Sequence, residues 1–198
     1  TGMQLKFING YRWPELIRLF QQGELEILQP VIATALNRQR GIFTDHWLTL
    51  DYALVTQKDA SVPASLEAIY PRVLVMPEGW SLNPVLKQRY PNLAVKIVDS
   101  TRTALEMVAN GQAYATLDSE TILRRTAGQF FLRDLVFHSE VAGLELLPAT
   151  LHFQLREDLQ PLADILNAAL AALPAEALAQ LQQRWLHDSP MPRDLALS

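Results

Sequence analysis

The chain contains no cysteine. This excludes disulfide bonds, thiol nucleophiles and cysteine-ligated metal sites. It suits a periplasmic protein, because an unpaired thiol is prone to oxidation there. Many cytosolic chains of this size also lack cysteine, so the compartment is indicated only weakly by this feature.

A surplus of basic residues and long apolar runs are also missing. The 198 residues include 17 Lys and Arg against 21 Asp and Glu, which gives a formal net charge of −4. The densest basic cluster, Arg38 to Arg40, holds two arginines, so no nucleic-acid partner is expected. No apolar run approaches the roughly 18 residues of a membrane span, and we expect no such span in this chain.

Motifs of catalysis and metal binding are absent as well. The sequence has no nucleophile elbow, no zinc-protease helix and no phosphate-binding loop. No two histidines have the i, i+4 spacing of a helical metal pair, so ordinary surface or core roles are expected for all four. They are His46, His138, His152 and His187. We therefore expect no enzyme activity, no metal and no cofactor.

The apolar pattern of the middle of the chain indicates an α/β protein. Apolar runs such as "RVLVM" and "LAVKIV" alternate with helical segments such as "LNPVLKQRY" and "STRTALEMVANG". Ser100 or Thr101 is a suitable N-cap for the last of these helices, and Gly111 follows its end. Alternation at this spacing predicts parallel strands covered by helices.

Further elements are expected toward both ends. "WPELIRLFQQGE" reads as a helix with Pro14 in its first turn. "ATLHFQL" alternates apolar and polar residues, as a half-buried strand does. Two amphipathic helices follow, "LQPLADILNAALAAL" and "PAEALAQLQQRWL", before a proline-containing tail.

The order of these segments resembles a known family. After the first helix come "GELEIL", "FTDHW", "YALVTQKD", "VLVMPEGWSL", "VDSTRTALEMVANGQA" and the closing "LNAAL...RWL". This set resembles the bacterial extracellular solute-binding proteins of family 3, which are type 2 periplasmic binding proteins or Venus-flytrap domains. It is most similar to the periplasmic sensor domains of hybrid histidine kinases and diguanylate cyclases. The resemblance covers roughly residues 1 to 187.

The resemblance implies a two-lobed α/β fold. Two hinge crossovers would join the lobes, which close on a small solute. Lobe 1 would comprise residues 1–57 and 147–190, lobe 2 would comprise residues 58–146, and residues 191–198 would form a tail or linker. "YALVTQKD" and "LPATLHFQL" would then lie at or near the crossovers.

In lobe 1 the resemblance implies a ligand-facing turn. The family has a T-x-x-R turn followed by F-[ST]-x-P-Y, where this chain reads "TALN" and "FTDHW". Thr34, Asn37 and Trp47 are thus the expected ligand residues. Asn37 stands where the family has an arginine, which grips a carboxylate through two charge-assisted hydrogen bonds that asparagine cannot make. Arg38 could replace it only if the turn changed register.

In lobe 2 the family offers backbone N–H groups and hydroxyls at a helix N-terminus, which suits an anion. Gly79, Trp80 and Ser81 occupy that turn. Ser81 and the turn amides would hold an anionic or carbonyl end of the solute, while Trp80 either covers it or packs in the core. Asp118 and Ser119 follow the strand "AYATL", near the place of the family's acidic residue, with Asp118 one position early.

The start of the chain departs from the resemblance. The family has a central strand and a helix before the segment that matches "TGMQLKF". We expect the lobe 1 sheet to lack that strand, which leaves an edge that something else must pair. A fragment, a shortened gene product or a strand supplied by another chain, for example in a homodimer, would each explain the difference.

The function implied is that of a periplasmic sensor domain in an inner-membrane signalling protein, with an amino-acid-like or carboxylate solute as its ligand. Two alternatives are a free solute-binding protein of an ABC-type transporter and a degenerate flytrap domain that acts through protein contacts. An enzyme on the same fold is a further alternative, but no motif supports it. The fold alone does not decide among them.

Overall fold

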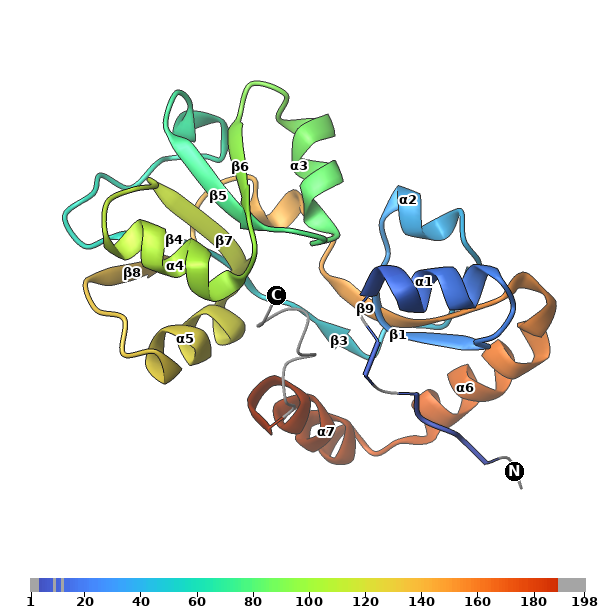
Figure 1. Ribbon diagram of the computed structural model, residues 1–198. Helices are drawn as coiled ribbons and strands as arrows, with labels where there is room; N and C mark the ends of the chain where they lie inside the picture. The colour runs from blue at the N-terminus through green and yellow to red at the C-terminus, as the bar shows by residue number, and fades with distance from the viewer. Residues whose placement is uncertain (1–3, 9, 12, 189–198) are drawn as a thin grey trace.

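The computed structural model describes residues 4–8, 10–11 and 13–188, with the backbone alone for 185–188, and it contains two β-sheets with their own helices (Figure 1). The first sheet has the order β1-β9-β2, with β3 also pairing with β9. The second has the order β6-β5-β7-β4-β8. The predicted two-lobed α/β architecture is confirmed, and we call the sheets with their helices lobe 1 and lobe 2.

The first sheet joins segments that are far apart in the sequence. Its strands are β1 (Ile27–Ile32), β2 (Ile42–Phe43), β3 (Leu48–Thr49) and β9 (Thr150–Leu155). The first three all pair antiparallel with β9, so β9 holds this sheet together. Within the described part of the chain, β1 pairs with β9 and with no other strand.

Lobe 1 carries helices from both ends of the chain. They are α1 (Trp13–Gln21), α2 (Ala35–Arg38) and α6 (Gln160–Ala172), with the 3-10 turn η3 (Glu157–Leu159) before α6. The last helix, α7 (Ala175–Asp188), contacts both lobes, because it lies close to α5 (Glu120–Gln129) of lobe 2 and Nε2 of its Gln182 donates to the carbonyl of Trp47 in lobe 1. Helix α1 has Pro14 in its first turn, as predicted, and buries Phe20 against Leu28 and Val31 of β1. Helix α6 is tied to the same lobe, because the backbone N–H of Asp45 donates to Oδ1 of Asn167 over 2.7 Å.

No single helix in the described ranges is long and apolar enough to cross a membrane. The bent pair Glu157–Ala172 and Ala175–Arg184 reaches the required length and composition together, with an angle of 106° between its halves.

The second sheet contains the predicted parallel strands. Its members are β4 (Tyr52–Gln57), β5 (Val73–Pro77), β6 (Ala94–Val98), β7 (Ala115–Ser119) and β8 (Leu135–His138). Strand β5 pairs parallel with β6 and β7, while β4 is antiparallel to β7 and β8. The helices of this lobe are α3 (Leu82–Arg89), α4 (Thr101–Ala109) and α5 (Glu120–Gln129), with the 3-10 turns η1 (Glu67–Ile69) and η2 (Leu144–Leu146).

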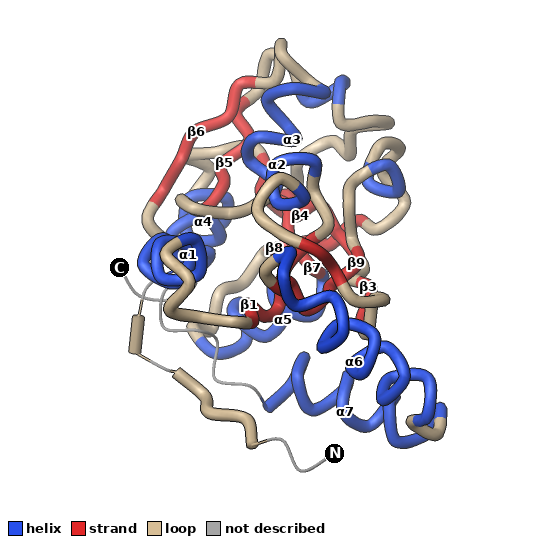
Figure 2. Tube along the Cα trace, turned by 90° about the vertical axis from the view of Figure 1, so that its right-hand side faces the viewer, coloured by secondary structure: helices blue, strands red, loops and turns tan. Residues whose placement is uncertain are grey.

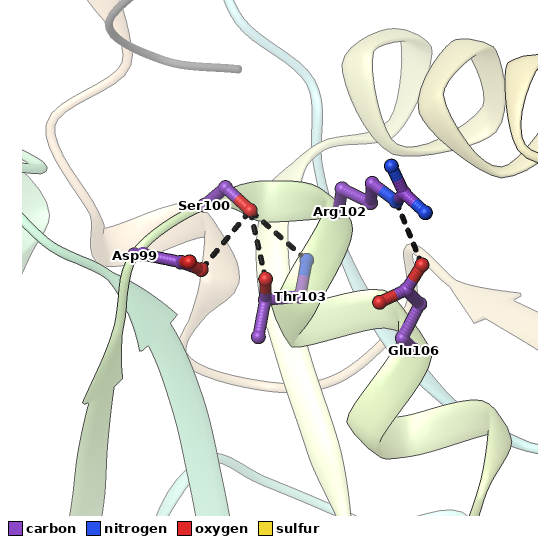
Figure 3. A network of polar contacts seen from close by, with 5 residues as sticks. All are labelled: Asp99, Ser100, Arg102, Thr103 and Glu106. Carbon is purple, nitrogen blue, oxygen red and sulfur yellow. Dashed lines mark hydrogen bonds and ion pairs between the residues drawn. The ribbon is translucent and has the colours of Figure 1, made fainter. Parts of the chain in front are cut away.

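The start of α4 shows how local chemistry sets a helix boundary (Figure 3). The N-cap is Ser100, one of the two predicted residues, and its Oγ accepts a hydrogen bond from the backbone N–H of Thr103 over 3.1 Å. The same hydroxyl donates to Oδ1 of Asp99 over 3.2 Å. Hydrogen bonds from Thr103 and Ser100 lower the pKa of Asp99. One turn along, Arg102 and Glu106 form an ion pair at 2.7 Å.

Two short crossovers connect the lobes, and they lie against each other. Leu48 and Thr49 pair with Leu151 and Thr150, and the backbone N–H of Leu50 donates to the carbonyl of Ala149 over 2.8 Å. The hydroxyl of Tyr52 then donates to the carbonyl of Pro148 over 2.7 Å. The chain therefore passes between the sheets at residues 49–52 and 147–150.

The first lobe boundary expected from the sequence needs correction. The sequence predicts it at residue 57, but the whole of β4, residues 52–57, belongs to the second sheet. Strand β4 pairs on both edges, with β7 and β8, and five of its six residues are buried. The crossover consequently comes before "YALVTQ" rather than after it.

One apolar core continues through the crossover region. Ile32, Trp47 and Leu151 of lobe 1 belong to the same buried cluster as Leu54 and Leu117 of lobe 2. A second cluster lies in lobe 2 around α4, and a third lies under α1 in lobe 1. The lobes thus share apolar contacts at the hinge in addition to its backbone hydrogen bonds.

Gly41 tests the close packing of lobe 1, with a glycine of lobe 2 as the control. A Cβ on Gly41 would lie 2.2 Å from the carbonyl oxygen of Leu155 in β9. We expect Gly41→Ala to lower the free energy of unfolding by about 1–3 kcal/mol, as overpacking does. The control is Gly128→Ala in α5, where no atom lies within 4 Å and alanine is the better helix former by about 1 kcal/mol. Urea denaturation measures both, and equal stabilities would contradict the packing described here.

Candidate functional site

The lobe 1 turn places Thr34 and Asn37 together at the start of α2. The Oγ1 of Thr34 accepts a hydrogen bond from the backbone N–H of Asn37 over 3.0 Å, which caps the helix. The Nδ2 of Asn37 donates to the carbonyl of Ile32 over 2.8 Å. The backbone carbonyl of Asn37 accepts a hydrogen bond from Nε2 of Gln154 over 2.6 Å. Both predicted residues are buried, and their polar groups hold the turn onto β1 and β9.

Arg38 follows Asn37 on the exposed side of the same short helix. Its guanidinium lies over the ring of Phe43 in β2, 5.4 Å from the ring centroid. This stacking directs the positive charge toward β2 while Asn37 occupies the interior. Asn37 therefore faces the interior of the lobe 1 turn, and Arg38 lies against β2.

Trp47 lies in the core at the crossovers. It is 9% exposed, and its indole stacks on Phe153 with centroids 6.1 Å apart. Its backbone N–H donates to the carbonyl of Leu151 over 3.0 Å, and its carbonyl accepts from Nε2 of Gln182 in α7. Trp47 is therefore positioned to fix the hinge region, at some distance along the chain from the turn of Thr34 and Asn37.

His152 in β9 is a buried histidine with both ring nitrogens occupied. Nδ1 lies 2.7 Å from the carbonyl of Thr44, and Nε2 lies 2.8 Å from Oγ1 of Thr150. Burial lowers the pKa of His152. It therefore has the core role expected from the sequence, and no group of three side chains suited to a metal ion occurs among the described residues.

The lobe 2 turn holds Gly79, Trp80 and Ser81 between β5 and α3. Gly79 is exposed and has a φ of +72°, a left-handed conformation that glycine adopts readily. Ser81 occupies the N-cap position and makes no side-chain hydrogen bond to the helix. Asn83 steadies the turn, because its Nδ2 donates to the carbonyl of Pro77 over 2.8 Å. The first amides of α3 therefore lack a side-chain cap from Ser81.

Trp80 is 7% exposed and belongs to the largest apolar cluster. Its indole Nε1 is buried and has no hydrogen-bond partner among the described residues. A buried donor without a partner costs free energy, so the site around Nε1 favours an acceptor. The ring of Trp80 packs in the core, as one of the two readings of the sequence predicts. Its Nε1–H group remains available as a hydrogen-bond donor beside the lobe 2 turn.

Asp118 and Ser119 end β7 at the same edge of the second sheet. Asp118 is 1% exposed, and its Oδ1 accepts a hydrogen bond from the backbone N–H of Ser119 over 2.5 Å. Its Oδ2 is buried and accepts no hydrogen bond from the part of the chain that the structure describes. Burial raises the pKa of Asp118 well above its ordinary value, because a desolvated carboxylate is costly. The carboxyl group is consequently biased toward its neutral form.

Parallel pairing brings the two lobe 2 segments to one edge. Strands β5 and β7 run in the same direction, with Val75 opposite Thr116, so the turn after β5 and the end of β7 lie at their carboxyl ends. The crossover meets this edge too, since the backbone N–H of Glu120 donates to the carbonyl of Asp51 over 2.8 Å. Both views of the molecule place α2 of lobe 1 near α3 of lobe 2 (Figures 1 and 2).

Sequence reasoning missed Tyr52. Its hydroxyl bridges the two crossovers, and it lies opposite Ser119 in the pairing of β4 with β7. Burial, with Asp118 as a second cause, raises the pKa of the Tyr52 hydroxyl. "YALV" reads as an ordinary apolar run, so no local signal distinguished this tyrosine from a core residue.

No family model matches the chain. Among curated proteins, the virulence sensor protein BvgS of Bordetella bronchiseptica is 26% identical over 193 residues, which cover 98% of this chain and 15% of BvgS. The sensor protein EvgS of Escherichia coli O157:H7 is 26% identical over 165 residues, 83% of this chain and 13% of EvgS. The chain thus spans about one seventh of the length of each of these relatives.

Solved structures agree with this. A double mutant of the VFT2 domain of Bordetella pertussis BvgS superposes with a TM-score of 0.75 at 25% identity, covering 93% of this chain and 78% of that one. The substrate binding protein of an amino acid ABC transporter gives a TM-score of 0.71 at 14% identity, covering 92% and 80%, and shares the fold. The chain is therefore homologous to the periplasmic VFT2 sensor domain of BvgS and has the Venus-flytrap fold of type 2 periplasmic binding proteins.

Proposed function

We propose that this chain is the ligand-sensing domain of a periplasmic signal-transduction protein and that it binds a small solute between its lobes. The observation that carries the proposal is the similarity to the BvgS sensor over 98% of the chain. The paired crossovers support it, because a short hinge between two sheets allows the lobes to close. The parent protein would be anchored in the inner membrane, with a kinase or cyclase output domain.

The proposed ligand contacts lie at two turns. Thr34 and Asn37 would serve lobe 1, and Gly79, Trp80 and Ser81 would serve lobe 2. The amides that begin α3 suit a carboxylate or carbonyl oxygen, since a helix N-terminus attracts negative charge. Trp80 Nε1, buried without a partner, offers one more donor to such an oxygen.

Asp118 and Ser119 would complete the site from the end of β7. Because burial biases the Asp118 carboxyl toward its neutral form, it can donate a hydrogen bond to an acceptor on the solute. With asparagine at the arginine position of lobe 1, the contacts are mostly neutral hydrogen bonds. This chemistry favours a solute with several acceptor oxygens, such as an amino-acid-like molecule or a carboxylate.

Two observations favour roles other than that of a sensor domain. The fold is shared with a binding protein of an amino acid ABC transporter, so a free solute-binding protein is the second candidate. The ring of Trp80 and the whole of Trp47 are buried in the core, which suits a degenerate domain that acts through protein contacts. The full gene separates the first two roles: a downstream membrane helix with a kinase or cyclase domain supports the sensor, and a stop codon after this domain supports the free protein.

Solute binding is tested by a thermal-shift screen with amino acids, polyamines, carboxylates, nicotinate-like aromatics and sugars. A ligand of the folded state stabilises it by about 2.7 kcal/mol at a hundredfold excess over Kd. We expect a carboxylate-bearing compound to raise Tm. Ser81→Ala should weaken its binding about tenfold, the effect of losing one hydrogen bond of about 1.4 kcal/mol.

The control for this screen is Ser139→Ala, at an exposed serine just after β8. It should leave the shift unchanged. A cooperatively folded chain that no compound stabilises would refute solute binding and leave the protein-contact role.

The state of Asp118 predicts a dependence of stability on pH. Its folded pKa is raised above the unfolded value of about 3.9, so its stabilising contribution is full below pH 4 and is lost as pH rises toward the folded pKa. Asp118→Asn removes this dependence. The variant should therefore gain stability relative to the parent as pH is raised from 4 to 8, as measured by urea unfolding.

Asp99→Asn supplies the opposite sign as a control. The pKa of Asp99 is lowered, so its contribution is present above the unfolded pKa and disappears as pH falls through the folded pKa. Asp99→Asn should therefore lose stability at pH 7 relative to the parent. Parallel pH profiles for the parent and Asp118→Asn would show that Asp118 is ionised in the folded protein.

A further inference from the structure

Both crossovers are fastened to lobe 2 at helices that carry proposed ligand residues. The first crossover is held at the start of α5, where the backbone N–H of Glu120 donates to the carbonyl of Asp51. Ser119, a proposed ligand residue, immediately precedes Glu120. The end of β7 is therefore joined to the first crossover through one peptide bond and one hydrogen bond.

The second crossover is held from the far end of α3. Arg89, the last residue of this helix, donates from Nη1 to the carbonyl of Leu146 in η2. Leu147 follows at once and begins the segment that crosses to lobe 1. Helix α3 therefore has Ser81 at one end and a contact with the second crossover at the other.

Tyr90, the residue after Arg89, packs closely against the segment that precedes the second crossover. Tyr90 is 6% exposed, and a Cβ placed on Gly143 would lie 2.8 Å from its hydroxyl oxygen. Gly143 directly precedes η2, and its backbone N–H donates to Oε2 of Glu145 over 2.9 Å. The end of α3 thus contacts the segment before the crossover both through Arg89 and through the ring of Tyr90.

This segment also belongs firmly to lobe 2. The backbone N–H of Leu66 donates to the carbonyl of Ala142 over 3.0 Å, and the N–H of Ala142 donates to the carbonyl of Ala64 over 3.2 Å. Leu144 is buried in the core cluster that also contains Leu86 of α3. Arg89 adds a directional polar contact beside this apolar packing, placed one residue before the chain leaves the lobe.

We propose that α3 is a coupling element that transmits displacement of the turn at residues 79–81 to the second crossover, with Arg89 as the positioning residue. A helix of eight residues is about 12 Å long and moves as a rigid body, so a shift at its N-terminus appears at its C-terminus. Only the identity of the trigger rests on the proposed function, because solute at the turn would supply the shift. The coupling itself is a property of the ligand-free protein.

The first test measures hydrogen exchange in the ligand-free chain. The amide of Leu50 bonds to Ala149 and so reports on pairing of the crossovers. Arg89→Met keeps the stem of the side chain and removes its donors. We expect the peptides covering residues 48–53 and 146–151 to exchange about threefold to tenfold faster, the effect of losing one hydrogen bond of ordinary strength.

The matched control is Lys87→Met, at an exposed position of the same helix. It removes a positive charge without touching the contact with Leu146. Exchange at the crossovers equal to that of the parent is expected for Lys87→Met. If Arg89→Met gives the same rates as this control, the proposal is overturned.

The second test asks whether a disturbance at the turn travels through Arg89. Gly79→Ala strains the turn through its left-handed φ of +72° and meets no atom within 4 Å. It should speed exchange of residues 146–151 in the parent and have little further effect in Arg89→Met, a non-additivity typical of coupled sites. Equal effects of Gly79→Ala in the parent and in Arg89→Met would show that Arg89 stabilises only its own surroundings. That result would refute transmission through Arg89. Since no ligand is used, failure of solute binding cannot be mistaken for failure of the coupling.

Discussion

The pairing of the two crossovers is the constraint on which the rest of the molecule depends. The backbone bond from Leu50 to Ala149 and the hydroxyl bond from Tyr52 to Pro148 hold the connecting strands side by side. These bonds fix the relative position of the two crossovers, so the lobes cannot slide along each other without breaking them. The apolar cluster that includes Trp47 and Leu117 continues across the same place, so close packing adds to these hydrogen bonds at the hinge.

Several polar side chains of the candidate site are buried, among them Asn37 and Asp118. The Asn37 carboxamide donates to the carbonyl of Ile32, and Thr34 caps α2, so both residues shape the lobe 1 turn. In lobe 2, desolvation is the main cause of the raised pKa of Asp118. The hydrogen bond from the backbone N–H of Ser119 acts in the opposite direction and lowers this pKa. A buried carboxylate without a partner is costly, so the Asp118 carboxyl group is biased toward its neutral form, which can donate a hydrogen bond.

Much of the fold was accessible from the sequence. Alternating strands and helices, the proline that opens α1 and the serine that caps α4 all appeared where expected, because each depends on residues within a few positions of one another. The first lobe boundary was misplaced by one strand. "YALVTQ" has the same apolar pattern whichever sheet it joins, and its partners β7 and β8 come about sixty and eighty residues later.

The same distinction between local signals and long-range contacts applies to the candidate site. The resemblance to the solute-binding family, rather than any local pattern, marks Thr34, Asn37, Gly79 and Ser81 as proposed ligand residues. Only the parallel pairing of β5 with β7 brings the lobe 2 turn and Asp118 to one edge. Tyr52 and Arg89 had no such signal, since their partners Pro148 and Leu146 are 96 and 57 residues away. Helices, strands and caps follow from near neighbours along the chain. Burial of Asp118 and pairing of the crossovers arise from segments that meet only when the chain has folded.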